Sequence, residues 1–170
     1  TWLPLTYSEA PTPVTMVLTG VMSKLGLYGV LRILLPIFPE QLRWVQTPLL
    51  WLTVASIVMG ALAAMAQRDI KRMLAYLSVS HLGYCWLGVL AAVQITPGDS
   101  KWMVEKSAAL SGAMLQMFNH GVIAATLFGM VGYLEQRSAG RRDINDFGGL
   151  RQAAPIFCGL MGIALFASIG

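Results

Sequence analysis

Five long apolar stretches follow one another along the chain, and a short polar or proline-containing segment separates each from the next. Each stretch holds about 18 residues or more, which is the length a helix needs to cross a hydrocarbon core of roughly 30 Å. They lack the period-2 alternation of apolar and polar residues that is typical of membrane β-barrels. The pattern therefore predicts five helices, at Pro13–Leu35, Gln46–Gln67, Met73–Ile95, Val104–Leu134 and Ala153–Gly170.

The composition places these helices in a membrane. The 170 residues are 56% hydrophobic and only 12% charged, with a mean hydropathy of +0.63, whereas soluble domains carry about 25% charged residues. We expect an all-α integral membrane protein, a polytopic helix bundle. The chain begins at Thr1 and its last apolar stretch reaches Gly170, so residues 1–170 are expected to be an internal fragment of one membrane domain. Thr1–Ser8 is expected to be an interfacial piece or half of a broken helix.

The basic residues predict the orientation of the helices. The net charge is +4, but the positive side chains occur in short loops, which indicates membrane topology and not nucleic-acid binding. Two segments, 67–72 and 135–152, follow helices that end on the same side, and they hold Arg68, Lys71, Arg72, Arg137, Arg141, Arg142 and Arg151. The opposite side holds fewer, namely Arg32, Arg43, Lys101 and Lys106. The richer side is predicted to be cytoplasmic, and Lys71 and Arg72 are interpreted as topology residues.

Lys24 interrupts the first apolar stretch near its middle. It lies eleven residues after Pro13 and twelve before Pro36, which is about 16–18 Å from either end of a helix. An ammonium at that depth costs roughly 3 kcal/mol or more, and it is too deep to reach water by snorkelling. We expect Lys24 to face protein or a water-filled cavity, with a functional role; the alternative is a lysine paired only for structure.

Two histidines are predicted at a similar depth on two other helices. His81 lies about 14 Å beyond Arg72, and His120 about 21 Å along its helix. Either histidine alone could be a satisfied core residue, but with Lys24 they form a set of titratable groups without a carboxylate. We interpret Lys24, His81 and His120 as a proton relay, in which bridging waters are held by Ser78, Tyr84, Gln116 and Asn119.

Other chemistry is less compatible with the sequence. Two histidines and a lysine, without a carboxylate or thiolate at ligand spacing, are a poor metal site. Cys85 and Cys158 lie in apolar helices and are interpreted as inert thiols. The sequence contains no phosphate-binding glycine loop and no nucleophile triad, so we expect neither a bound cofactor nor a metal.

Several short motifs occur in order along the chain, namely Glu9-Ala10-Pro11-Thr12, the stretch from Gly20 through Lys24 to Gly29, Asn119-His120-Gly121 and Gly148-Gly149-Leu150; the most specific is Asp69–Tyr84. These motifs resemble the antiporter-like subunits of respiratory complex I, the NADH-quinone oxidoreductase. The resemblance covers essentially the whole chain and is nearest to the M-type subunit, or subunit 4. One departure is Leu5-Thr6-Tyr7, where the family usually has Asp-Ala-His.

The resemblance implies a fourteen-helix fold with inverted five-helix repeats and broken helices, of which this chain would hold the eighth to the twelfth helix. It implies that Lys24, His81 and His120 are the relay residues of the eighth, tenth and eleventh helices. It further implies a proton-pumping subunit in a bacterial inner membrane. Its partners would be lipid and other membrane-arm subunits, which would carry the NADH, FMN, iron–sulfur and quinone sites.

Two alternatives stay open at this point. The same motifs occur in Mrp-type cation/proton antiporter subunits and in membrane-bound hydrogenases, so the complex and the ion are not determined. A structural membrane subunit that conducts nothing is the second alternative.

The predicted orientation can be tested by cysteine labelling. Cysteines placed at Gln67 and Ser138 should resist a membrane-impermeant thiol reagent added outside intact cells, because both segments are predicted to face the cytoplasm. Labelling of both positions from outside would show that the topology is opposite to the predicted one.

Overall fold

The computed structural model describes residues 2–94 and 100–169, and these residues are almost entirely helical. No strand occurs within those two ranges; the only β-type pairing there is an isolated antiparallel bridge. Four described helical segments are long and apolar enough to cross a membrane, at Thr12–Ile37, Pro39–Met65, Ile70–Val93 and Met103–Arg137. The prediction of an all-α, multi-pass membrane protein is confirmed.

The first span is one helical run that contains two π-helical segments. It consists of α2 (Thr12–Val17), a π-helical segment η1 (Leu18–Met22), α3 (Ser23–Gly29), a second π-helical segment η2 (Val30–Leu34) and α4 (Leu35–Ile37). Its bounds are close to the predicted Pro13–Leu35, but the π segments were not predicted. A short helix, α1 (Trp2–Glu9), precedes the run and ends before Pro11, as expected for one half of a broken helix.

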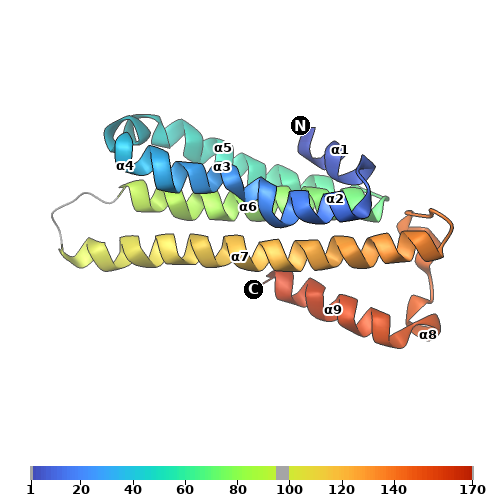
Figure 1. Ribbon diagram of the computed structural model, residues 1–170. Coiled ribbons are helices and arrows are strands. Elements are labelled where there is room, and N and C mark those ends of the chain that lie inside the picture. The colour runs from blue at the N-terminus through green and yellow to red at the C-terminus, as the bar shows by residue number, and fades with distance from the viewer. Residues whose placement is uncertain (1, 95–99, 170) are drawn as a thin grey trace.

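The next three helices pack side by side (Figure 1) and are longer than predicted. Helix α5 spans Pro39–Met65, α6 spans Ile70–Gln94 and α7 spans Ser100–Arg137. Helix α5 begins before the predicted Gln46 because Pro39 occupies its first turn, where a missing N–H costs nothing. The segment between the third and fourth predicted helices lies largely outside the described residues, and α7 already begins at Ser100, before the predicted Val104.

After α7 the chain turns back and packs a shorter helix against it. The turn contains a 3₁₀ segment, η3 (Ile144–Phe147), and α8 (Leu150–Ala153), and it leads to α9 (Pro155–Ile169). Figure 1 shows α9 lying along one half of α7. This helix corresponds to the fifth predicted stretch, and its start at Pro155 agrees with the expected start near Ala153.

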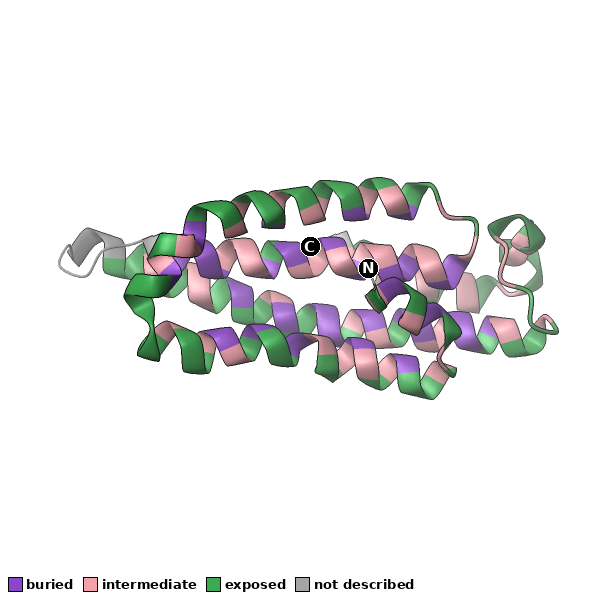
Figure 2. Ribbon diagram, turned by 90° about the horizontal axis from the view of Figure 1, so that it is seen from above, coloured by how far each residue is buried: buried purple, intermediate pink, exposed green. Residues whose placement is uncertain are grey.

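Helix α6 lies in the middle of the bundle, between α5 and α7. Small residues permit the close approach on both sides of α6. A Cβ at Gly60 would lie 3.1 Å from the backbone nitrogen of Ser80 on α6. This central helix carries many of the fully buried side chains, among them Cys85, Val89 and Leu90, whereas α5 exposes most of its outer face (Figure 2). That outer face carries large apolar side chains, including Trp51, Met59 and Met65, as expected for contact with lipid or another subunit.

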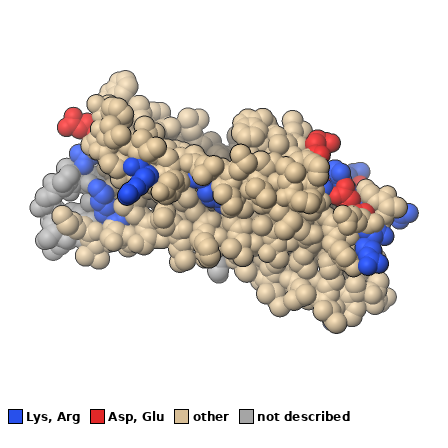
Figure 3. All heavy atoms as spheres, in the orientation of Figure 1, with Lys and Arg blue, Asp and Glu red and all other residues tan. Residues whose placement is uncertain are grey.

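The two basic segments meet at one end of the bundle. Asp69 and Asp143 form the isolated bridge, the Ile70 N–H donates to the carbonyl of Arg142 at 3.0 Å, and the Ile144 N–H donates to that of Arg68 at 2.9 Å. Charged side chains gather mainly near the two ends of the molecule, with a mostly uncharged middle (Figure 3). The prediction that segments 67–72 and 135–152 share one side is confirmed.

The closest approach between two backbones near the middle of α7 generates a stability prediction. A Cβ at Gly121 would lie 2.8 Å from the carbonyl oxygen of Gly20, a contact that neither backbone can relieve by a side-chain movement. Gly121→Ala should therefore destabilise the subunit by about 1–3 kcal/mol. Gly112→Ala on the same helix, where nothing lies within 4 Å of the new Cβ, should be neutral or stabilising. The measurement is the thermal midpoint of the purified complex, and equal midpoints for the two variants would contradict the packing account.

Candidate functional site

Lys24 is buried immediately after the first π segment. It is 7% exposed, and its ammonium donates a hydrogen bond to the carbonyl of Thr19. The Ser23 N–H donates to the carbonyl of Leu18, five residues back, which is the π pattern. In an α-helix the Ser23 N–H would donate to the carbonyl of Thr19, four residues back. Here it does not, and the Thr19 carbonyl is left for other donors. It accepts instead from the Ser23 hydroxyl at 3.1 Å and from Lys24. The change of pitch makes a backbone acceptor available to the buried ammonium.

Helix α7 passes directly beside the Lys24 side chain. A Cβ at Gly121 would lie 3.9 Å from Cε of Lys24, so only a glycine lets the backbone of α7 come this close. His120 is the preceding residue on α7, so it lies next to the point where α7 meets the Lys24 side chain. Among the described residues Lys24 forms no ion pair with a carboxylate. The ammonium is therefore stabilised by a backbone dipole, and the neighbouring titratable side chain on α7 is a histidine rather than an acid.

The two histidines stand next to each other across the interface of α6 and α7. Their ring centroids are 5.5 Å apart, with the rings tilted by 34°. His120 is 7% exposed, and its Nε2 has no hydrogen-bond partner among the described residues. His81 is half-buried. The structure thus brings together the two histidines that the sequence placed at similar depth.

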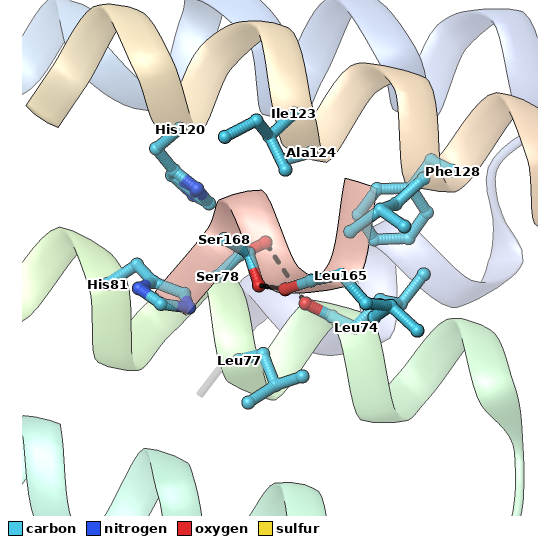
Figure 4. Close-up of a pocket in the computed structure, with 11 residues that line it drawn as sticks. Leu74, Leu77, Ser78, His81, His120, Ile123, Ala124, Phe128, Leu165 and Ser168 are labelled. Atoms are coloured by element: carbon cyan, nitrogen blue, oxygen red, sulfur yellow. Dashed lines mark hydrogen bonds between the residues drawn. The ribbon is translucent and has the colours of Figure 1, made fainter. Parts of the chain in front are cut away.

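A small cavity adjoins both imidazoles between α6, α7 and α9. Its volume is about 20 Å³, sufficient for about one water molecule. Figure 4 shows His81 and His120 pointing toward it, with Ser78 and Ser168 near its middle. A second hollow of about 90 Å³ continues past the same two histidines to Gln116 and Asn119. Room for water therefore exists beside the unpartnered nitrogen of His120.

The four supporting polar residues lie around these hollows in different ways. Gln116 and Asn119 line the second hollow. Ser78 lines the first, with its hydroxyl donating to the carbonyl of Leu74 at 3.0 Å. Tyr84 is 52% exposed and lies at a wider, open hollow of about 680 Å³ that also reaches His81. All four thus line a hollow that His81 also lines.

Ser168 is a lining residue that sequence reasoning missed. It lies on α9 and borders the small cavity, the second hollow and the open one. Its hydroxyl donates to the carbonyl of Leu165 at 2.6 Å. The available signal was a lone hydroxyl near the end of an otherwise apolar helix, whose partner helix could not be inferred from the sequence.

Charged side chains form a second cluster at the end of the bundle where the basic loops meet. The Lys71 ammonium lies 2.7 Å from one carboxylate oxygen of Glu135, and the Arg142 guanidinium lies 2.7 Å from the other. Arg142 also donates to the carbonyl of Ser8 at 3.0 Å, which joins α1 to the cluster. Removing one member of a buried ion pair costs about 3–5 kcal/mol, because the other charge is left uncompensated.

This cluster adds to one interpretation made from the sequence. The sequence indicates Lys71 as a topology residue, and the structure shows that it is also 2% exposed and ion-paired. Its charge therefore also holds two helices together, a contact that the sequence did not indicate. Arg72 pairs more loosely with Glu9, at 3.5 Å, and Arg68 is exposed. Arg68 is therefore the suitable residue for a topology control.

Both cysteines are free thiols, Cys85 buried and Cys158 half-buried. Within the described part of the chain, no three His, Cys, Asp or Glu residues lie together as metal ligands would. The groups assembled at mid-bundle are thus an amine, two imidazoles and several hydroxyl and amide side chains. Such groups can hold water and exchange protons.

Known proteins share this sequence and arrangement. The family described as "NADH:quinone oxidoreductase/Mrp antiporter, TM" matches residues 1–170. This chain belongs to that family of transmembrane subunits.

Individual relatives match over nearly the whole chain. Subunit M of the NADH-quinone oxidoreductase of Rickettsia prowazekii is 38% identical over 170 residues, which are 100% of this chain and 32% of the relative. The NAD(P)H-quinone oxidoreductase chain 4 of Microcystis aeruginosa is 37% identical over 99% of this chain and 28% of its own length. The F(420)H(2) dehydrogenase subunit M of Methanosarcina mazei is 38% identical over 99% of this chain and 31% of its own length.

A solved structure shares the fold. In the membrane-bound sulfane sulfur reductase, an archaeal respiratory membrane complex, one chain superposes with a TM-score of 0.79 at 26% identity, covering 96% of this chain and 31% of that one. The sequence described here thus spans about a third of the length of these relatives.

Proposed function

We propose that this chain is part of a membrane-arm subunit that translocates protons in a quinone-reducing respiratory complex, with Lys24, His81 and His120 as the relay. The observation that carries the proposal is the grouping of these three titratable side chains in the middle of the bundle. In the part of the chain that the structure describes, the buried Lys24 ammonium has no carboxylate partner and lies near the buried His120. There the His120 Nε2 also has no hydrogen-bond partner, and His120 and its neighbour His81 line cavities with room for water.

The chemistry follows from the groups present. A buried lysine changes its proton affinity readily, and histidine titrates near neutral pH. The Lys24 ammonium can release a proton to a water beside His120, leaving a neutral amine that needs less stabilisation in the membrane. His120 and His81 can then accept and pass the proton, since each imidazole has one nitrogen that accepts while the other donates. The Thr19 carbonyl holds the ammonium form and favours its return.

The names of the relatives support a place in a larger assembly. Three of them are subunits of NADH-quinone, NAD(P)H-quinone or F(420)H(2) oxidoreductases. We propose that the redox cofactors lie on other subunits and that this chain binds none. Its partners are then lipid and other membrane-arm subunits. The proposed location is a bacterial inner membrane, with segments 67–72 and 135–152 in the cytoplasm.

The family name itself favours one alternative, a subunit of an Mrp-type cation/proton antiporter, and a membrane-bound hydrogenase subunit is a related possibility. The relay residues would serve proton movement in either. Neighbouring genes for quinone-site and iron–sulfur subunits distinguish the leading proposal from both. A subunit that conducts nothing would tolerate apolar replacements of Lys24 and both histidines without loss of proton translocation.

The first test concerns the lysine. In the complete complex, Lys24→Ala should lower the initial rate of proton translocation at least about tenfold, with complex content unchanged, because positioned acid–base groups contribute about 10²–10⁴-fold. Lys24→Arg should fail as well, since a guanidinium stays protonated and cannot release the proton. Proton uptake into inverted membrane vesicles is the measurement. Wild-type rates in the arginine variant would exclude Lys24 from the relay.

The second test treats the two histidines as one path. His81→Ala and His120→Ala should each reduce the protons moved per electron pair, and the double variant should lose little more than the worse single one. Arg68→Gln, an exposed change on the basic side, is the control and should leave coupling intact. Losses that add up and follow the amount of assembled complex would indicate two separate structural roles instead.

A further inference from the structure

A second group of polar side chains lies at Lys24, and no role has yet been assigned to it. It comprises the hydroxyls of Tyr7 on α1, Thr19 on η1 and Ser23 on α3, which we call the hydroxyl cluster. Tyr7 is 1% exposed, and its ring packs edge-on against Phe128 of α7, with centroids 5.7 Å apart. Its hydroxyl donates to the carbonyl of Leu18 at 3.4 Å. The hydroxyl of a buried tyrosine normally has a hydrogen-bond partner.

Thr19 is the centre of the cluster. It is fully buried, and its carbonyl accepts from both the Ser23 hydroxyl and the Lys24 ammonium. Its own hydroxyl is buried and has no hydrogen-bond partner among the described residues, with the hydroxyls of Tyr7 and Ser23 nearby. A buried hydroxyl that lacks a partner costs about 1–3 kcal/mol. A water molecule hydrogen-bonded to the Thr19 hydroxyl would remove that cost.

The position of α1 supports a specific role for this cluster. The Thr15 hydroxyl donates to the carbonyl of Tyr7 at 3.1 Å, which holds the end of α1 against the start of the first span. Tyr7 thereby reaches the π segment from outside the helix that carries Lys24. On the other side, α7 brings His120 near the same lysine, and His81 of α6 lies beside His120. The Lys24 ammonium thus has two distinct polar neighbourhoods, the hydroxyl cluster and the histidines.

We propose that the hydroxyl cluster binds a water molecule and forms a second proton contact of Lys24, separate from the histidines. In the transfer, an aqueous hydronium ion on the α1 side gives up one proton. Each hydroxyl and the bound water then accepts one proton on oxygen and releases another. The neutral Lys24 amine becomes an ammonium, and every oxygen returns to its starting state. The proposal rests on the function proposed above, in which Lys24 alternates between charged and neutral forms.

The test uses paired variants of the full-length subunit in the complete complex. Tyr7→Phe and Thr19→Val remove a hydroxyl and keep the shape of the side chain, whereas Thr19→Ser keeps the hydroxyl. Tyr28→Phe, on the exposed face of α3, is the matched control for loss of a phenol. Proton uptake into inverted vesicles and complex content are measured together.

The expected result is a several-fold slower proton uptake in Tyr7→Phe and Thr19→Val at normal complex content, with wild-type uptake in Thr19→Ser and Tyr28→Phe. The double variant Tyr7→Phe/Thr19→Val should be no slower than the worse single one, because both hydroxyls serve one path. Wild-type uptake in both single variants, together with an inactive Lys24→Ala, would contradict the proposed role of the hydroxyl cluster and leave the proposed function of the chain unaffected. Uptake that falls only in step with complex content would also overturn it. Normal proton uptake in Lys24→Ala would contradict the proposed function itself.

Discussion

A positive charge in the middle of a membrane helix must be stabilised by protein, because no bulk water reaches it. In this chain the charge is Lys24, and the described residues offer it no carboxylate. Its hydrogen bond goes to a backbone carbonyl that the π segment η1 makes accessible. A backbone dipole stabilises an ammonium less strongly than a carboxylate does. In the proposed relay this difference would allow Lys24 to release its proton, whereas a salt bridge at the same place would hold it.

Close helix packing keeps this arrangement away from lipid. Gly20 and Gly121 let the backbones of η1 and α7 approach, and this approach brings His120 beside the lysine. On the other side of α6, Gly60 allows α5 to approach the backbone at Ser80. Membrane helices associate through such small residues, since lipid provides no hydrophobic driving force between them. The same glycines that stabilise the bundle therefore also determine which polar groups share a cavity.

The ion pairs of Glu135 lie away from Lys24 and the two histidines. Lys71, Glu135 and Arg142 form a cluster at the end of the bundle, and the Arg142 guanidinium extends it to α1 by donating to the carbonyl of Ser8. The cluster joins the beginning of α6 and the end of α7, the two helices that carry the histidines. The ion pairs at the end of the bundle and the proposed relay residues at its centre are thus separated along the same pair of helices.

The sequence by itself determined the membrane class, the order of the apolar helices and the side shared by the basic loops, because hydropathy and charge act residue by residue. It also placed Lys24, His81 and His120 at comparable depth, since depth follows from counting residues along a helix. Only the tertiary structure decided the rest. The π segments lie inside an apolar run whose hydropathy is that of an ordinary helix. The burial of Lys71 depends on a partner 64 residues away along the chain. Packing between distant segments decides which faces of the helices meet, and the local sequence carries no signal for it. That packing brings Ser168 to the histidines and Tyr7 to Thr19.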